Sequence, residues 1–237
     1  MNKQSNVYTT IYIIVLVLVV GTALAVTALS LSDRQQKNIN ADKMCQILAS
    51  AKVSADASNV EDLFAKYITD SYVVNEKGEK IEGEDAFNVN VATQVKVPAA
   101  ERKLPVFVYK TEEGDLKYIL PAYGACLWGP IWGYVAVNAD GKTVYSAYFA
   151  HQGETPGLGA EIDKPAFQEK FNNKELISAN GEFHPIAVVK NGQVVKGTEN
   201  YTVDGISGGT ITSKGVSDML DICLTPYKTF LENLSTK

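Results

Sequence analysis

The residues best suited to chemistry lie near the C-terminus, in residues 204–213, where Thr210 follows Gly208 and Gly209. Glycine has no Cβ atom, so this pair would let another macromolecule approach the Thr210 hydroxyl. An amphipathic helix is expected next, capped by Ser213, with apolar residues at helical spacing: Val216, Met219, Leu220 and Cys223. A helix N-terminus favours anions, so the segment could present a threonine for modification beside a phosphate site. The alternative is a Gly-Gly turn before an ordinary helix.

The same segment resembles the flavinylation motif of proteins that carry FMN on a threonine. That motif has an aspartate, two spacers, Ser or Thr, Gly, Ala and Thr, and the matching residues here are Asp204, Ser207, Gly208, Gly209 and Thr210. Gly209 stands where alanine is usual, which predicts a more flexible loop. In that family a dedicated FMN transferase passes the FMN moiety of FAD to the last threonine as a phosphoester. The resemblance therefore implies covalent FMN on Thr210, with Thr212 as the nearby alternative.

Two further segments point to one family. Residues 151–162 read His-Gln-Gly-Glu-Thr-Pro-Gly-Leu-Gly-Ala-Glu-Ile, and residues 127–134 read Leu-Trp-Gly-Pro-Ile-Trp-Gly-Tyr. Both resemble stretches of the C subunit of the sodium-translocating NADH:quinone oxidoreductases. With an N-terminal membrane anchor and a length of 237 residues, the resemblance covers essentially the whole chain. It implies an electron relay through FMN in a membrane complex that reduces a quinone such as ubiquinone and exports Na⁺. Its expected partners are the other subunits of that complex and the FMN transferase.

The resemblance also suggests residues that would surround the flavin ring. Gly157 would allow close backbone contact, Leu158 would form an apolar wall, and Thr155 lies beside both in the sequence. Trp128 either covers another side of the ring or is a core tryptophan. A bound flavin supplies redox chemistry itself, so a carrier of this kind needs no general base.

A membrane anchor is expected at the N-terminus. Residues 7–32 contain no charged side chain, and a helix needs about 20 apolar residues to span a bilayer. A cleaved signal peptide is the alternative, but the apolar run is longer than such peptides use. The predicted organisation is an N-terminal tail (1–6), a transmembrane helix (7–32) and an FMN-binding domain (33–237).

The orientation of this anchor is ambiguous. Lys3 flanks one side and Arg34, Lys37 and Lys43 flank the other, so positive-inside counting mildly places the domain in the cytoplasm. The resemblance instead places it on the periplasmic, outer face of the cytoplasmic (inner) membrane. We take the second orientation as the prediction.

The remaining pattern indicates an α+β domain with an antiparallel sheet and flanking helices. Apolar residues at helical spacing predict helices around 44–51 and 60–67, and Asp163 is expected to cap a short helix that runs to Phe171. The final helix should kink at Pro226. Three hairpins are predicted, with strands at 106–109 and 118–120, at 134–137 and 144–148, and at 186–189 and 194–195.

Several kinds of site are not indicated. The chain has two histidines and three cysteines without metal-binding spacing, so no metal site is predicted, and its net charge of −5 gives no reason to expect nucleic-acid binding. Residues 157–159 lack the third glycine of a dinucleotide-binding turn. We expect Glu154, Glu161 and His151 to anchor their loop, and Cys45, Cys126 and Cys223 to be structural thiols.

Two other functions remain open on the sequence alone. The chain could be the equivalent flavinylated subunit of an Rnf-type ferredoxin:NAD oxidoreductase, or a membrane-anchored binding or scaffold module whose Ser-Gly-Gly-Thr segment is unmodified. Yellow colour that survives denaturation would distinguish a flavin carrier from a scaffold. Neighbouring genes for an NADH-binding subunit would distinguish the two kinds of carrier.

Overall fold

The computed structural model describes residues 6–236, and the chain divides into two compact units between Lys43 and Met44. Helix α1 (Asn6–Ser50) belongs to both units. Its N-terminal part is exposed and has a mean hydropathy of 2.7 over 18 residues, so it is long and apolar enough to cross a membrane. The extent predicted for the membrane-spanning part, 7–32, lies within this helix, whereas Lys3 lies outside the described residues.

The helix expected around 44–51 is the last part of α1 and not a separate element. No glycine or proline interrupts residues 33–50, so nothing in the sequence ends the helix earlier. Burial begins at Gln46, within the part of α1 that belongs to the second unit.

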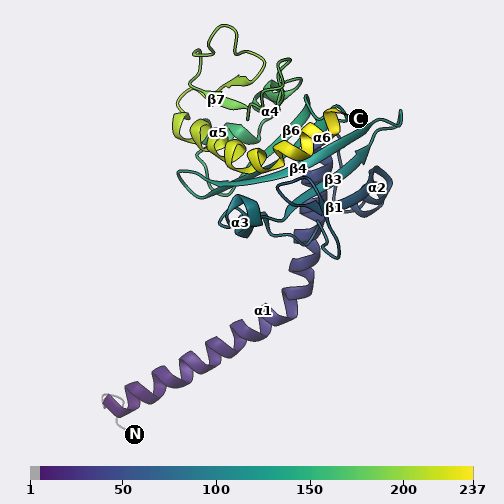
Figure 1. Ribbon diagram of the computed structural model, residues 1–237. Coiled ribbons are helices and arrows are strands. Elements are labelled where there is room, and N and C mark those ends of the chain that lie inside the picture. The colour runs from purple at the N-terminus through teal and green to yellow at the C-terminus, as the bar shows by residue number, and fades with distance from the viewer. Residues whose placement is uncertain (1–5, 237) are drawn as a thin grey trace. The chain divides into compact units, whose positions relative to one another are not determined.

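The second unit is built on a six-stranded antiparallel sheet with the order β2-β1-β3-β4-β5-β6 (Figure 1). This arrangement confirms the predicted fold class and two of the predicted hairpins, β3–β4 and β5–β6. Strand β1 was not predicted. The strands are β1 (Ile68–Val74), β2 (Lys80–Ile81), β3 (Leu104–Lys110), β4 (Leu116–Ala125), β5 (Pro130–Asn138) and β6 (Val144–His151).

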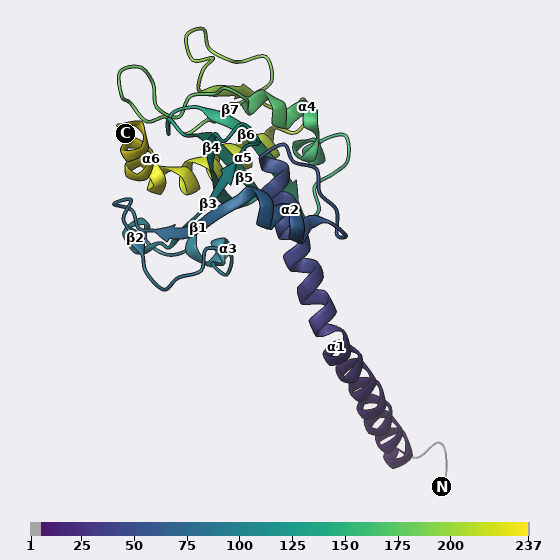
Figure 2. The ribbon, with the colours of Figure 1, turned by 90° about the vertical axis from the view of Figure 1, so that its right-hand side faces the viewer.

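Helices cover both faces of this sheet. The helix α5 (Thr210–Leu224) packs between β4 and the strand β7 (Ala187–Val189), as the ribbon shows from two directions (Figures 1 and 2). On β5, Ile131 faces the core that α5 completes, and its neighbour Trp132 faces the opposite side, where its Nε1–H donates to Gln46 Oε1 at 2.8 Å. Neighbouring side chains of β5 therefore point to opposite faces of the sheet, where one contacts the core beside α5 and the other contacts the end of α1.

The shorter helices lie around this core. The helix α2 (Val60–Tyr67) confirms the second predicted helix. A 3₁₀ turn at Thr225–Tyr227 separates α5 from α6 (Lys228–Ser235), which confirms the break expected at Pro226. The others are α3 (Val91–Gln94) and α4 (Pro165–Gln168), with 3₁₀ turns at Ala99–Glu101, Gly159–Asp163 and Glu169–Phe171.

Two local predictions were wrong. The third hairpin does not form, because β7 pairs in parallel with β8 (Thr202–Asp204) and Val195 is 63% exposed. The turn at Gly192 does exist, but its N–H donates to Asp204 Oδ1 at 2.8 Å, so the turn is held by β8. Asp163 does not cap a helix either, since Lys164 occupies the N-cap of α4 and no side chain caps it.

Candidate functional site

Thr210 is the first residue of α5, and Gly209 is the N-cap with no side-chain cap hydrogen bond. The expected Ser213 cap was therefore wrong, because Ser213 lies one turn inside the helix. Its Oγ accepts the Ile206 N–H at 2.9 Å, and its own N–H donates to Gly209 O at 2.8 Å. These bonds fold residues 204–209, the acceptor loop, back over the start of the helix.

Exposure separates the two candidate threonines. Thr210 is exposed at the helix N-terminus, where unpaired N–H groups and the helix dipole favour a negative charge. Thr212 is only 3% exposed, and its hydroxyl donates to Glu154 Oε2 at 2.7 Å. An enzyme that modifies the folded chain would therefore reach Thr210 and not Thr212.

The acceptor loop packs against residues 152–158, the proline loop, through Leu158. Gly208 has φ +74°, and a Cβ there would lie 2.8 Å from Leu158 Cδ2, so this position needs glycine for its backbone and for the contact. A Cβ at Gly209 would lie 3.1 Å from Ile206 Cβ and Cγ2. The glycine that replaces the usual alanine thus relieves crowding with Ile206 in this chain.

Glu154 joins the proline loop to the other two segments. Its carboxyl group is 5% exposed; Oε1 accepts the Trp128 N–H at 3.0 Å while Oε2 accepts the Thr212 hydroxyl. The Glu154 N–H donates to His151 Nδ1 at 3.1 Å. Gly159 leaves room for this arrangement, because a Cβ there would overlap both Glu154 Oε2 and Thr212 Oγ1.

These contacts confirm that His151 and Glu154 anchor the loop. Glu161 does so too, since its Oε1 accepts the Gly157 N–H at 3.1 Å. His151 Nε2 lies 3.6 Å from Asp163 Oδ2, so both ring nitrogens face loop-holding partners. The sequence did not reveal the partner of Glu154, because Thr212 lies 58 residues further along the chain.

Cys126 lies under the same site. A Cβ at Gly215 of α5 would lie 3.0 Å from Cys126 Sγ, so the helix and the β4–β5 turn meet at this thiol. Burial raises the pKa of the Cys126 thiol, and the charge of Glu154 and a hydrogen bond with it raise that pKa further, against hydrogen bonds from Leu127 and Thr212 that lower it. A thiol with a raised pKa is less reactive than a free cysteine, which is consistent with the predicted structural role.

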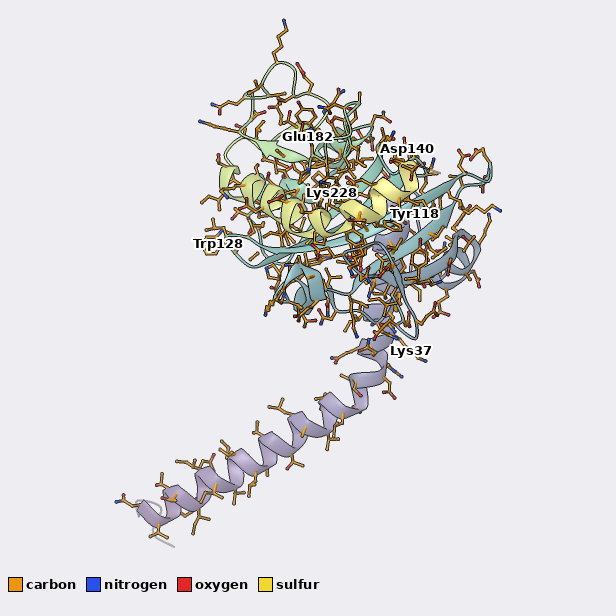
Figure 3. The ribbon with its side chains drawn as sticks, in the orientation of Figure 1. Lys37, Tyr118, Trp128, Asp140, Glu182 and Lys228 are labelled. Atoms are coloured by element: carbon orange, nitrogen blue, oxygen red, sulfur yellow. The ribbon has the colours of Figure 1, made fainter. Side chains whose placement is uncertain are left out.

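Exposed apolar side chains occur in all three segments of the site. Trp128 is 63% exposed at the edge of the domain, so the alternative of a core tryptophan was wrong (Figure 3). Thr155 and Gly157 are exposed in the proline loop. The exposed apolar residues of the three segments are Leu127, Trp128, Leu158 and Ile211.

Not every motif residue takes part in this surface. Ser207 is exposed in the acceptor loop, beside Gly208. Asp204 is half-buried at the end of β8, and its carboxylate holds the Gly192 turn. Its role in the structure is to fix the start of the acceptor loop.

These residues fit a flavin nucleotide by their chemistry. An exposed hydroxyl at a helix N-terminus suits a phosphoryl group, and a rim of apolar side chains suits a flat aromatic ring. No group of three or more His, Cys, Asp or Glu that would hold a metal ion occurs in residues 6–236.

Comparison with known proteins agrees with this chemistry. The FMN-binding domain family matches residues 127–225, a span that begins at the β4–β5 turn and contains all three segments. The C subunit of the Na(+)-translocating NADH-quinone reductase of Vibrio campbellii is 32% identical over 94% of this chain and 92% of its own length. The same protein of Pseudomonas aeruginosa is 30% identical over 98% of this chain and 97% of its own length.

Solved structures of related proteins have the same fold. The crystal structure of the corresponding Na(+)-translocating NADH-quinone reductase protein of Parabacteroides distasonis has a TM-score of 0.78 and 47% identity, covering 85% of this chain and 96% of that one. NqrC of Shewanella oneidensis, at 24% identity, has a TM-score of 0.69 and covers 84% of this chain and all of that one. The chain belongs to the family formed by the C subunits of the Na(+)-translocating NADH-quinone reductases.

Proposed function

We propose that Thr210 carries FMN through a phosphoester bond and that the chain relays electrons within a Na⁺-translocating NADH-quinone reductase. The observation that carries the attachment is the contrast between an exposed Thr210 and a buried, hydrogen-bonded Thr212. When bound, FMN supplies the redox chemistry of the site. The relatives named above support the assembly with other subunits of that reductase and the coupling to Na⁺ export.

The residues of the site would hold and shield the cofactor. The N-terminus of α5 favours the negative phosphate beside Thr210, and no residue of the helix's own first turn is acidic. Leu158 and Trp128 offer apolar surface that excludes water, with Thr155 and Gly157 beside Leu158. His151 is occupied in holding the proline loop and is not assigned a proton-transfer role.

The attachment is tested with the full chain, co-expressed with an FMN transferase and run on a denaturing gel under ultraviolet light. We expect fluorescence from the wild type and from Thr212→Val, and none from Thr210→Val. Both variants replace a hydroxyl by a methyl group, so each is the other's control. Peptide mass mapping should find the added FMN only on the peptide with Thr210; fluorescence from Thr210→Val equal to wild type would contradict the assignment.

We also propose that α1 is retained as a single-pass anchor and that the domain lies on the outer face of the cytoplasmic membrane, where the transferase would reach it. An exported reporter such as alkaline phosphatase, fused to the C-terminus, should be active. A reporter that works only in the cytoplasm should be inactive in the same place. Activity of the cytoplasmic reporter would instead support the orientation indicated by Arg34, Lys37 and Lys43.

The relay has its own test. The purified chain should not oxidise NADH, because no dinucleotide-binding turn accompanies the site, whereas its flavin should be reduced by NADH in the assembled complex. Rapid NADH oxidation by the purified chain would refute the relay.

A further inference from the structure

The least expected group near Thr210 is the buried carboxyl of Glu154. It forms no salt bridge with any cationic side chain in the described residues 6–236, and its hydrogen-bond donors are neutral. The donors are the backbone N–H of Trp128 at Oε1, the hydroxyl of Thr212 at Oε2 and the thiol of Cys126. They come from the β4–β5 turn and from α5, so one side chain holds the proline loop to both.

The donor set selects a carboxylate at this position. Burying such a group away from cations is costly unless its oxygens are hydrogen-bonded. Both Glu154 oxygens accept a hydrogen bond, whereas the amide nitrogen of a glutamine would face a donor and could not accept. A purely packing role would be met by a neutral side chain without this cost, so the charge itself calls for an explanation.

The position of Thr212 supplies one. Thr212 lies in the first turn of α5, two residues after Thr210, so the bond from its hydroxyl to Glu154 fixes the helix start that presents Thr210. Trp128, whose N–H is held by the other oxygen, is one of the exposed apolar residues of the three segments.

We propose that Glu154 is a positioning residue that holds the β4–β5 turn, the proline loop and the start of α5 in register, and that its unneutralised charge lowers the reduction potential of a flavin attached there. The second part rests on the proposed attachment at Thr210. A negative charge near a flavin opposes the gain of an electron, because it repels the added charge through a poorly screening interior.

The first test uses the full chain without flavin, so it does not depend on the attachment. Hydrogen exchange is measured for the Trp128 amide and for residues 206–213 in wild type and Glu154→Gln. Because the glutamine amide keeps only one acceptor oxygen, the Trp128 N–H and the Thr212 hydroxyl cannot both stay bonded, and we expect exchange to rise about tenfold or more in at least one of the two segments. Glu169→Gln, the same change at an exposed site, should exchange as wild type does.

Thr212→Val is the second variant, because it removes one donor and leaves Glu154 in place. It should speed exchange in residues 206–213 and leave the Trp128 amide closer to wild type. Exchange in Glu154→Gln that matches Glu169→Gln in both segments would overturn the positioning role.

The second test uses the flavin-loaded chain. Glu154→Gln should take up FMN more slowly than wild type, and its flavin should have a more positive midpoint potential, whereas Glu169→Gln should match wild type in both. A loosened loop alone would slow uptake without a systematic positive shift, so the potential reports the charge. An unchanged midpoint potential in Glu154→Gln would overturn the charge effect. Wild-type protein that takes up no FMN would refute the proposed attachment, and the exchange experiment would still decide the positioning role.

Discussion

Replacing Gly159 with alanine should destabilise the domain strongly, although it adds a single methyl group. Gly159 has no positive φ, so its backbone accepts alanine without conformational strain. The new Cβ would, however, overlap both Glu154 Oε2 and Thr212 Oγ1. The hydrogen bond between these two side chains must break, or the start of α5 must move away from the proline loop.

The expected cost follows from these two effects. Loss of a hydrogen bond to a charged group costs about 1.5–3 kcal/mol. Extra volume in a well-packed interior costs about 1–3 kcal/mol. Together they predict a fall of about 2.5–6 kcal/mol in the free energy of unfolding, or about 5–24 °C in Tm for a domain of this size.

The assay is thermal unfolding of the full chain in detergent, followed by circular dichroism, with Gly153→Ala as the matched control. A Cβ at Gly153 would lie 3.5 Å from Trp128 O, an ordinary van der Waals distance, so this variant should lie within about 0.5 kcal/mol of wild type. If Gly159→Ala unfolds at the same temperature as Gly153→Ala, the bond between Glu154 and Thr212 does not hold the domain as described.

Contacts outside the acceptor loop lead to three other predictions. The Arg102 guanidinium donates to three backbone carbonyls, among them Ile222 O in the last turn of α5 at 2.8 Å. Arg102→Met should therefore lower the free energy of unfolding, measured in urea, by about 2–3 kcal/mol, and a decrease below about 0.5 kcal/mol would contradict this. Trp132→Phe removes the donor to Gln46 and should cost about 1 kcal/mol in the same measurement; a double-mutant cycle with Gln46→Ala should give a coupling free energy of about that size, and a coupling near zero would contradict the bond. Burial raises the pKa of the Cys126 thiol, so its alkylation at about pH 8 should be slower than that of free cysteine and should accelerate as the pH rises. Equal alkylation rates for Cys126 and free cysteine would contradict the raised pKa.

The hairpins show how far local pattern carries. Strands β3 to β6 were predicted because each hairpin has a run of apolar or alternating apolar and polar residues on both sides of a short turn. The two runs and the turn lie within about 15 residues of one another, so they can be recognised locally. The third hairpin failed because β7 is paired in parallel with β8, whose residues come after the turn and the exposed Val195. An Asn-Gly turn specifies a bend, but the partner of the preceding strand depends on which segment can be buried beside α5.

The start of α5 failed for a related reason. Ser213 has the chemistry of an N-cap, yet the helix begins at Thr210 because the Ser213 hydroxyl is taken by the Ile206 N–H. That bond exists only when the acceptor loop folds back on the helix. The capping rule therefore predicted both the cap residue and its place incorrectly, since the N-cap is Gly209 and no side chain caps the helix.

The sequence by itself determined the apolar N-terminal helix, the α+β class and the three segments that form the site, because each depends on composition or on neighbours a few residues away. Only the tertiary structure showed that Thr212 is buried while Thr210 is exposed, placed Trp128 at the surface and gave Glu154 its partners. Those outcomes depend on burial and on hydrogen bonds between residues as far apart as Glu154 and Thr212. Such contacts form when the sheet, the proline loop and α5 pack together, and no local pattern in the chain records them.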